Sequence, residues 1–258
     1  MALQIYLAVT PGDYQEAAAH SRSFAHVAYR LGPGSTLLRQ NLLVQTRGGL
    51  LTISDQNAPE ITEPEKVCAA VLRECGRRAY TGALLDFEQP VSRDRQVFAE
   101  QLGRQLSANR RTLYVPEHYA RAVSSAVPLI CTAISGGSFT ERLREAADLR
   151  GGAGKLALDV QRLRMDFRLP ARTGDGTPLS AQELKALVDR EAPSVFFSQD
   201  LCARYFTYTR NGDAHFVLFD DSGTLNQKLK IGANLGFSAA FFMWPEIRDI
   251  AGELTFPR

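Results

Sequence analysis

The sequence predicts an α/β fold, a single (β/α)8 barrel, and three features lead to that prediction. The chain has 258 residues, a length that suits one large domain. Eight short apolar runs alternate with longer segments of helical periodicity, as they do in a barrel of parallel strands. The first apolar run is followed by Thr10-Pro11-Gly12-Asp13 and not by a Gly-rich phosphate-binding turn. A doubly wound open sheet is therefore the weaker alternative.

The eight predicted strands are rich in Leu, Ile, Val and Phe, and Gly, Pro, Asp or Ser bounds each of them. In chain order they are Leu3–Thr10, Phe24–Leu31, Gly49–Ser54, Gly82–Glu88, Thr112–Glu117, Pro128–Ile134, Lys155–Val160 and Ser238–Glu246.

Amphipathic segments between these runs predict the helices. In Pro64–Arg78, Val67 and Cys75 fall on one side, as expected for a helix with one buried face. Pro64 and Ser180 are typical of helix starts. The other predicted helices are Arg93–Ala108, Thr140–Leu149, Ala181–Arg190 and Ser222–Leu235.

One segment interrupts the alternation of strands and helices. Arg204–Asp220 contains two aromatic runs around Asn211-Gly212, a dipeptide that tolerates positive φ and favours a tight hairpin. Together with Thr173–Leu201 it predicts a β-hairpin excursion between strands 7 and 8, covering roughly residues 173–221. We expect residues 1–258 to form one domain with this elaboration.

Composition and charge exclude several classes of function. Thirty Lys and Arg residues against 28 Asp and Glu residues give a net charge of +2, which does not favour nucleic acid or an anionic membrane as partner. No apolar run approaches the roughly 20 residues of a membrane span. The four cysteines form no C-x-x-C pair and have no His at ligand spacing, so we expect reduced cysteines, no metal and no cofactor.

The fourth predicted strand carries the chemistry. In Gly82–Glu88, the alternate residues from Ala83 to Phe87 are all apolar and suit packing under the outer helices, while the opposite face ends in Asp86 and Glu88. That second face points into a barrel, at the end where active sites lie. Side-by-side carboxylates, about 6–7 Å apart at Cα, raise the pKa of one of them, which suits a general acid with an electrostatic helper. The alternative is a solvated strand end whose acids pair with Arg or Lys.

The same strand resembles a known family. Tyr80–Glu88 is similar to the fourth-strand signature of family-18 glycoside hydrolases, D-G-x-D-x-D-x-E, and most of all to the spore-cortex and peptidoglycan lytic branch, where it ends in Asp-Phe-Glu. The matching residues are Gly82, Asp86 and Glu88. Thr81 and Leu84 depart from the pattern.

The resemblance continues near the C-terminus. His215–Asp221 is similar to the strand before the family's last helix, and Ala239–Trp244 is similar to its eighth strand. In the family a Trp of that strand forms the floor of the sugar site. The resemblance therefore implies this role for Trp244, the single Trp of the chain, with an aromatic contribution of about 1 kcal/mol.

The function that the resemblance implies is hydrolysis of a β-linked glycan containing N-acetylglucosamine, peptidoglycan being one example, by substrate-assisted acid catalysis. Glu88 would protonate the leaving glycosidic oxygen. The acetamido oxygen of the substrate would attack the anomeric carbon, while Asp86 orients the acetamido group. The partner is then an oligosaccharide or polysaccharide, and the oligomeric state stays open.

Two departures favour a different reading. Leu84 removes an acidic neighbour of Asp86, and Leu129–Ser135 lacks the Tyr that hydrogen-bonds the acetamido group in the family. Thr132 or Ser135 would have to replace it. The alternative is a catalytically dulled, chitinase-like barrel that binds glycan, and a third reading is a barrel kept for protein contacts.

Three further residues are candidates for binding substrate. Tyr6 lies on the polar face of the first strand, where it lines the pocket or packs in the core. Glu117 ends the fifth strand and either reaches the mouth or opens the next helix, where the dipole favours an acid. Ser135 begins a Ser-Gly-Gly-Ser loop that binds an anion or serves as a flexible loop with a helix cap.

The sequence shows no signal peptide, since the N-terminus lacks a basic n-region. We therefore expect a cytoplasmic or spore-associated protein. An extracytoplasmic location would require a leader that precedes this sequence.

Overall fold

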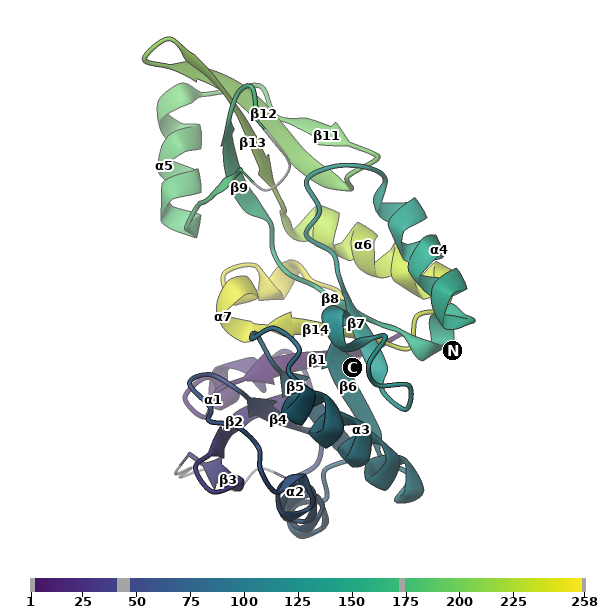
Figure 1. The fold of residues 1–258 in the computed structure, drawn as a ribbon. Helices are drawn as coiled ribbons and strands as arrows, with labels where there is room; N and C mark the ends of the chain where they lie inside the picture. Colours follow the sequence, from purple (N-terminus) through teal and green to yellow (C-terminus); the bar gives the residue numbers. More distant parts are fainter. Residues whose placement is uncertain (1–2, 41–46, 172–174, 257–258) are drawn as a thin grey trace.

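The computed structural model describes residues 3–40, 47–171 and 175–256. Within them, eight parallel strands form a closed barrel in the order β1-β14-β8-β7-β6-β5-β4-β2, and β2 closes it by pairing with β1 (Figure 1). The strands are β1 (Gln4–Val9), β2 (Phe24–Gly32), β4 (Leu50–Ser54), β5 (Gly82–Asp86), β6 (Thr112–Pro116), β7 (Val127–Cys131), β8 (Ala157–Asp159) and β14 (Ala239–Met243). The predicted (β/α)8 barrel is confirmed, and each predicted strand range overlaps one barrel strand.

Helices connect the barrel strands on the outside. The longer ones are α2 (Pro64–Arg78), α3 (Arg93–Ala108), α4 (Phe139–Arg150) and α6 (Ser222–Leu235). Short helical turns are α1 (Tyr14–Ala17), η1 (Glu117–Tyr119), η2 (Ala153–Lys155), α7 (Trp244–Ile247) and η3 (Ala251–Glu253). One strand, β3 (Thr36–Arg39), pairs antiparallel with β2 and was not indicated by the apolar runs. No helix of the described residues is long and apolar enough to cross a membrane.

The barrel interior is filled by side chains, so the barrel is a packed core and not a pore. Every barrel strand contributes to this inner cluster, whose buried members are Ala8, Ala25, Leu50, Leu84, Tyr114, Leu129, Ala157, Ala239 and Phe241. As the period-two pattern predicts, Ala83, Leu85 and Phe87 face the other way, into the apolar layer under α2 and α3. The alternation therefore leaves Asp86 on the inner side of β5.

Gly82 allows β5 to lie close to β6. An ideal Cβ at this position would lie 2.1 Å from the carbonyl oxygen of Thr112, far inside contact distance. A residue with a side chain would have to push these two barrel strands apart. The glycine that the family resemblance picked out thus has a packing reason of its own, at the start of the strand that carries Asp86.

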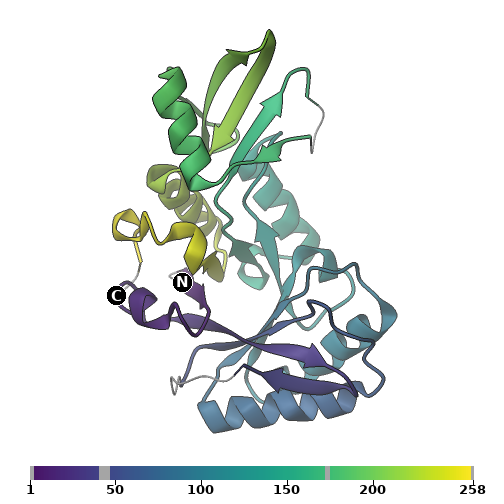
Figure 2. The same ribbon diagram turned by 90° about the vertical axis from the view of Figure 1, so that its left-hand side faces the viewer.

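The chain forms a second sheet after β8 and before α6. It is antiparallel, with the order β10-β9-β13-β12-β11, and it stands with α5 at one end of the molecule (Figure 2). Its elements are β9 (Arg164–Arg168), β10 (Thr177–Pro178), α5 (Ala181–Glu191), β11 (Phe196–Ser198), β12 (Ala203–Arg210) and β13 (Asp213–Phe219). Leu184 and Leu187 of α5 pack on Phe206 and Val217 of the sheet.

The excursion is thus larger than a hairpin. β12 and β13 pair on either side of Asn211-Gly212, which both have positive φ, but the sheet already begins at Arg164. Thr173, where the expected excursion starts, lies outside the described residues. An isolated hairpin is only marginally stable in water, and the additional strands with α5 bury the apolar side chains that a hairpin alone would expose. That the chain is a single domain stays a prediction.

Candidate active site

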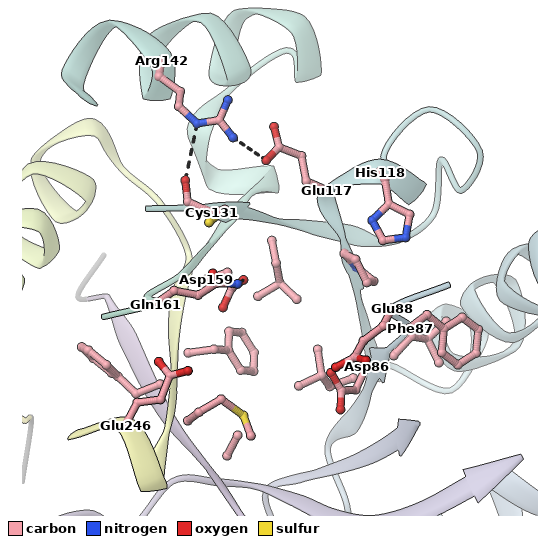
Figure 3. Close-up of a pocket in the computed structure, with 18 residues that line it drawn as sticks. Asp86, Phe87, Glu88, Glu117, His118, Cys131, Arg142, Asp159, Gln161 and Glu246 are labelled. Carbon is pink, nitrogen blue, oxygen red and sulfur yellow. Dashed lines mark hydrogen bonds and ion pairs between the residues drawn. The ribbon is translucent and has the colours of Figure 1, made fainter. Parts of the chain in front are cut away.

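A cavity of about 860 Å³ opens at the C-terminal ends of β5, β6, β7, β8 and β14 (Figure 3). Because the strands are parallel, residues that end different strands meet at this rim. The cavity is rich in carboxylates, which are Asp86, Glu88, Glu117, Asp159 and Glu246. Leu84 and Phe241 of the inner barrel cluster lie among its apolar lining.

Asp86 and Glu88 lie next to each other on one wall of the cavity (Figure 3). Asp86 is the last residue of β5 and is half-buried, while Glu88 follows the strand and is exposed. Burial raises the pKa of Asp86, and the negative charges of Glu88 and Asp55 raise it further. The pair therefore combines a shielded carboxyl group whose pKa is raised with an exposed one that a ligand can reach.

A buried ion pair holds the backbone of Glu88. Asp55 follows β4 and is fully buried; its Oδ1 accepts the Glu88 backbone N–H at 3.0 Å. Its Oδ2 accepts a bond from Nε of Arg95 on α3, at 3.1 Å. Arg95 is buried as well and also donates to the Ala58 carbonyl. These bonds connect β4, the turn after β5 and α3, so that the position of Glu88 depends on all three.

Asp159 and Gln161 lie across the cavity from that pair (Figure 3). Asp159 ends β8, and its Oδ2 accepts a 2.7 Å bond from Nε2 of Gln161. Burial raises the pKa of Asp159 to about 6; the charges of Glu246, Asp86 and Glu117 act in the same direction, while the Gln161 bond opposes them. The cavity thus holds a carboxyl group that exchanges its proton near pH 6.

Glu117 and Arg142 form the far edge of the cavity. Nη2 of Arg142, on α4, lies 2.6 Å from Oε2 of Glu117, and Nε of the same arginine donates to the Cys131 carbonyl at 3.4 Å. His118 and the partly buried Cys131 also line this side. Glu117 is therefore at the mouth, where it begins the short turn η1 and is paired with a cation.

Trp244 is not the floor of this cavity. Its side chain is fully buried on the outer side of β14, where Nε1 donates to Oε2 of Glu16 at 3.1 Å. The alternation of the strand places Phe241 and Met243 inward and Trp244 outward. Met243, which is 36% exposed, lines the cavity in its place. This corrects the role that the resemblance implies for Trp244.

Two other candidates lie away from the cavity lining. Tyr6 is inside the barrel, where its ring stacks on Phe241 with centroids 5.1 Å apart, and burial raises its pKa. Ser135 is exposed in the loop after β7. Neither is among the residues that line the cavity. Thr132, the other suggested substitute for the family Tyr, is buried, and its hydroxyl has no hydrogen-bond partner among the described residues.

Several cavity residues were missed by the reading of the sequence, namely His118, Arg142, Asp159, Gln161, Met243 and Glu246. A signal existed for two of them, because Asp159 and Glu246 lie at the ends of predicted barrel strands, as Asp86 does. Arg142 lies inside a helix and gave no such signal. Among the described residues, no group of three or more His, Cys, Asp or Glu side chains is arranged to hold a metal ion.

No protein-family model and no curated protein matches the sequence. Solved structures match its fold. The chitinase of Chromobacterium violaceum has a TM-score of 0.72 at 17% identity, covering 98% of this chain and 97% of that one. The spore cortex-lytic enzyme SleL of Bacillus megaterium has a TM-score of 0.66 at 12% identity, covering 99% and 74%. The class V chitinase of Nicotiana tobaccum has a TM-score of 0.67 at 10% identity, covering 99% of both chains.

Proposed function

We propose that this chain is a glycoside hydrolase that cleaves a β-linked, N-acetylglucosamine-containing glycan by substrate-assisted acid catalysis. One observation carries the proposal: Asp86 and Glu88 share a wall of a cavity of about 860 Å³ at the C-terminal end of the barrel. This is the place and the pair of groups that such chemistry needs. The shared fold with proteins named chitinase and spore cortex-lytic enzyme supports the same choice.

Glu88 is the proton donor in this proposal. It is exposed toward the cavity and its backbone is held by Asp55. Its proton passes to the glycosidic oxygen as the bond to the anomeric carbon breaks, and the acetamido oxygen of the same sugar forms the new bond to that carbon. Water then attacks the anomeric carbon, and the bond between that carbon and the acetamido oxygen breaks. The Glu88 carboxylate takes a proton from the attacking water, which restores the starting state.

Asp86 orients and stabilises the acetamido group in this proposal. It is half-buried beside Glu88, and its pKa is raised mainly by burial and then by the Glu88 charge. When the acetamido nitrogen gains positive charge, an ionised Asp86 stabilises it at short range in a site that is partly shielded from water.

A glycan-binding barrel without hydrolysis is the second candidate. Phe241 and Met243 line the cavity, for which the family resemblance implies a Trp. β7 ends in Cys131, and no Tyr follows it that could hydrogen-bond the acetamido group. Either change weakens the hold on the acetamido group. The cavity and its polar rim would still bind sugar in that case.

Replacing Glu88 with Gln tests the proposal. The parent, Glu88→Gln and the control Glu60→Gln, an exposed carboxylate away from the cavity, are incubated with chitooligosaccharides and with peptidoglycan fragments, and products are identified by mass spectrometry. Turnover should fall about 10²–10⁴-fold in Glu88→Gln only, while glycan affinity persists.

Equal cleavage by Glu88→Gln and the parent would show that Glu88 is not the acid. If neither protein yields products but both bind sugar with the same affinity, the binding barrel is the correct function.

A further inference from the structure

The Asp86–Glu88 pair lies between two cavities. Besides the large one, a second cavity of about 230 Å³ is lined by the same two carboxylates and by residues of β2 and β4. We call the cavity of about 860 Å³ the first lobe and the cavity of about 230 Å³ the second lobe. A glycan that crosses the pair would therefore have room for a sugar unit on each side of it.

Strand register places one cation in the second lobe. Arg30 of β2 pairs with Ser54 of β4, and Ser54 pairs with Asp86 of β5. Neighbouring strands lie about 4.8 Å apart, so the Cα of Arg30 is about 10 Å from that of Asp86 along one row. Arg30 is exposed, lines the lobe, and has no ion-pair partner among the described residues.

The two lobes differ in charge. Besides Asp86 and Glu88, the first lobe is lined by the carboxylates of Glu117, Asp159 and Glu246. The single arginine in its lining, Arg142, is already bound to Glu117. Tyr29 also lines the second lobe, but its hydroxyl donates to Glu74 on α2. The remaining polar side chains of the second lobe are neutral hydroxyl and amide groups, supplied by Gln40, Ser54, Gln56 and Asn57. A carboxylate on a sugar would be repelled in the first lobe and attracted to Arg30 in the second.

We infer that the second lobe is a subsite for a sugar unit that carries a carboxylate, and that the guanidinium of Arg30 binds it. Arginine suits this role because its planar fork donates two parallel hydrogen bonds to one carboxylate. The amides of Gln40, Gln56 and Asn57 match sugar hydroxyls as donors and acceptors. The inference rests on the proposed function. It adds that the preferred glycan alternates a neutral amino sugar with an acidic sugar, either a lactyl ether or a uronic acid.

Binding is measured by calorimetry in the Glu88→Gln background, so that the readout does not depend on cleavage. The probes are a chitooligosaccharide, an oligosaccharide alternating N-acetylglucosamine with N-acetylmuramic acid, its methyl ester, and an oligosaccharide alternating N-acetylglucosamine with glucuronic acid. The variants are Arg30→Gln and, as control, Arg22→Gln, an exposed arginine that precedes β2 and does not line either lobe.

We expect the acidic glycan to bind more tightly than its ester, and Arg30→Gln to weaken that binding about tenfold or more with little change for the chitooligosaccharide. Arg22→Gln should behave like the parent. The muramic and glucuronic probes show which carboxylate fits.

Equal affinity for acid and ester, or an equal loss for acidic and neutral glycans in Arg30→Gln, would overturn the inference. Failure of the proposed function is a separate outcome, because it appears as absence of cleavage products in the parent, whatever the binding preference.

Discussion

At the scale of single residues, Asp159 links the chemistry of the cavity to the stability of the fold. Its pKa is raised from 3.8 to about 6, chiefly by burial. Between these two pH values the folded chain binds more protons at this site than the unfolded chain does. The contribution of Asp159 to the free energy of unfolding therefore falls as pH rises from 3.8 to about 6, and the full cost of keeping it ionised in the folded state persists at higher pH.

Asp159→Asn removes that cost. We expect the variant to be more stable than the parent well above pH 6 by as much as about 3 kcal/mol, and equal to it below pH 3.8, where Asp159 is protonated in both states. Urea unfolding at the two pH values measures the difference. Asp148→Asn, at an exposed site on α4, is the control and should follow the parent. A stability gain that is the same at both pH values would contradict the assignment.

Met243 at the end of β14 and Trp244 at the start of α7 should respond differently to truncation. Trp244→Ala empties a fully buried site and should lower the free energy of unfolding by about 3–5 kcal/mol, with little effect on the glycan affinity of the folded fraction. Met243→Ala should weaken glycan binding severalfold at a much smaller cost in stability, because Met243 is 36% exposed in the cavity lining. Chemical denaturation and calorimetry measure the two effects. A loss of affinity confined to Trp244→Ala would restore the family role to Trp244.

At the scale of elements, the turn after β5 is positioned by α3 through Asp55. Asp55→Ala and Arg95→Met both break the buried pair and should each cost about 3–5 kcal/mol of stability. Only Asp55→Ala removes the acceptor of the Glu88 N–H. We therefore expect turnover to fall about 10–100-fold, with KM nearly unchanged, in Asp55→Ala and clearly less in Arg95→Met.

Hydrogen exchange of the Glu88 amide gives an independent readout for these two variants. The amide should exchange faster in Asp55→Ala, because its acceptor is lost, and remain protected in Arg95→Met. Equal turnover in both variants would mean that the pair contributes stability alone.

At the scale of the whole molecule, a buried cluster joins the second sheet to the barrel. Nζ of Lys228 on α6 lies 2.8 Å from Oδ2 of Asp220, and both side chains are fully inaccessible to solvent. Asp220 also accepts the backbone N–H of Leu163 and the hydroxyl of Thr224. Leu163 precedes β9 and Asp220 follows β13, so the cluster ties together the two strands through which the chain enters and leaves the second sheet.

Lys228→Met should lower the free energy of unfolding by about 3–5 kcal/mol, because it leaves the Asp220 charge buried without its partner. The double variant Lys228→Met/Asp220→Asn should recover part of that loss, since it removes the charge but keeps an acceptor for Leu163. Thermal unfolding of the parent, the single variant and the double variant tests this. A double variant that is less stable than the single one would contradict the explanation.

Local patterns in the sequence are sufficient for the barrel itself. Each apolar run corresponds to one barrel strand, because a strand buried on both faces requires continuous apolar residues. Helix bounds agree equally well at Pro64–Arg78 and Arg93–Ala108, where one apolar face repeats at the helical period. The alternation along β5 also predicts that Asp86 faces inward.

The sequence by itself determined which segments are strands and helices, and which face of β5 carries the acidic pair, because these properties depend on residues close together in the chain. Only the tertiary structure decided which groups share the cavity with Asp86. Asp159 and Glu246 lie far along the chain and join it because barrel closure brings the ends of all parallel strands to one rim. The tertiary structure also decided that Trp244 points outward. The register of β14 against β1 and β8 fixes which residues face inward, and a shift by one residue would reverse the direction of every side chain.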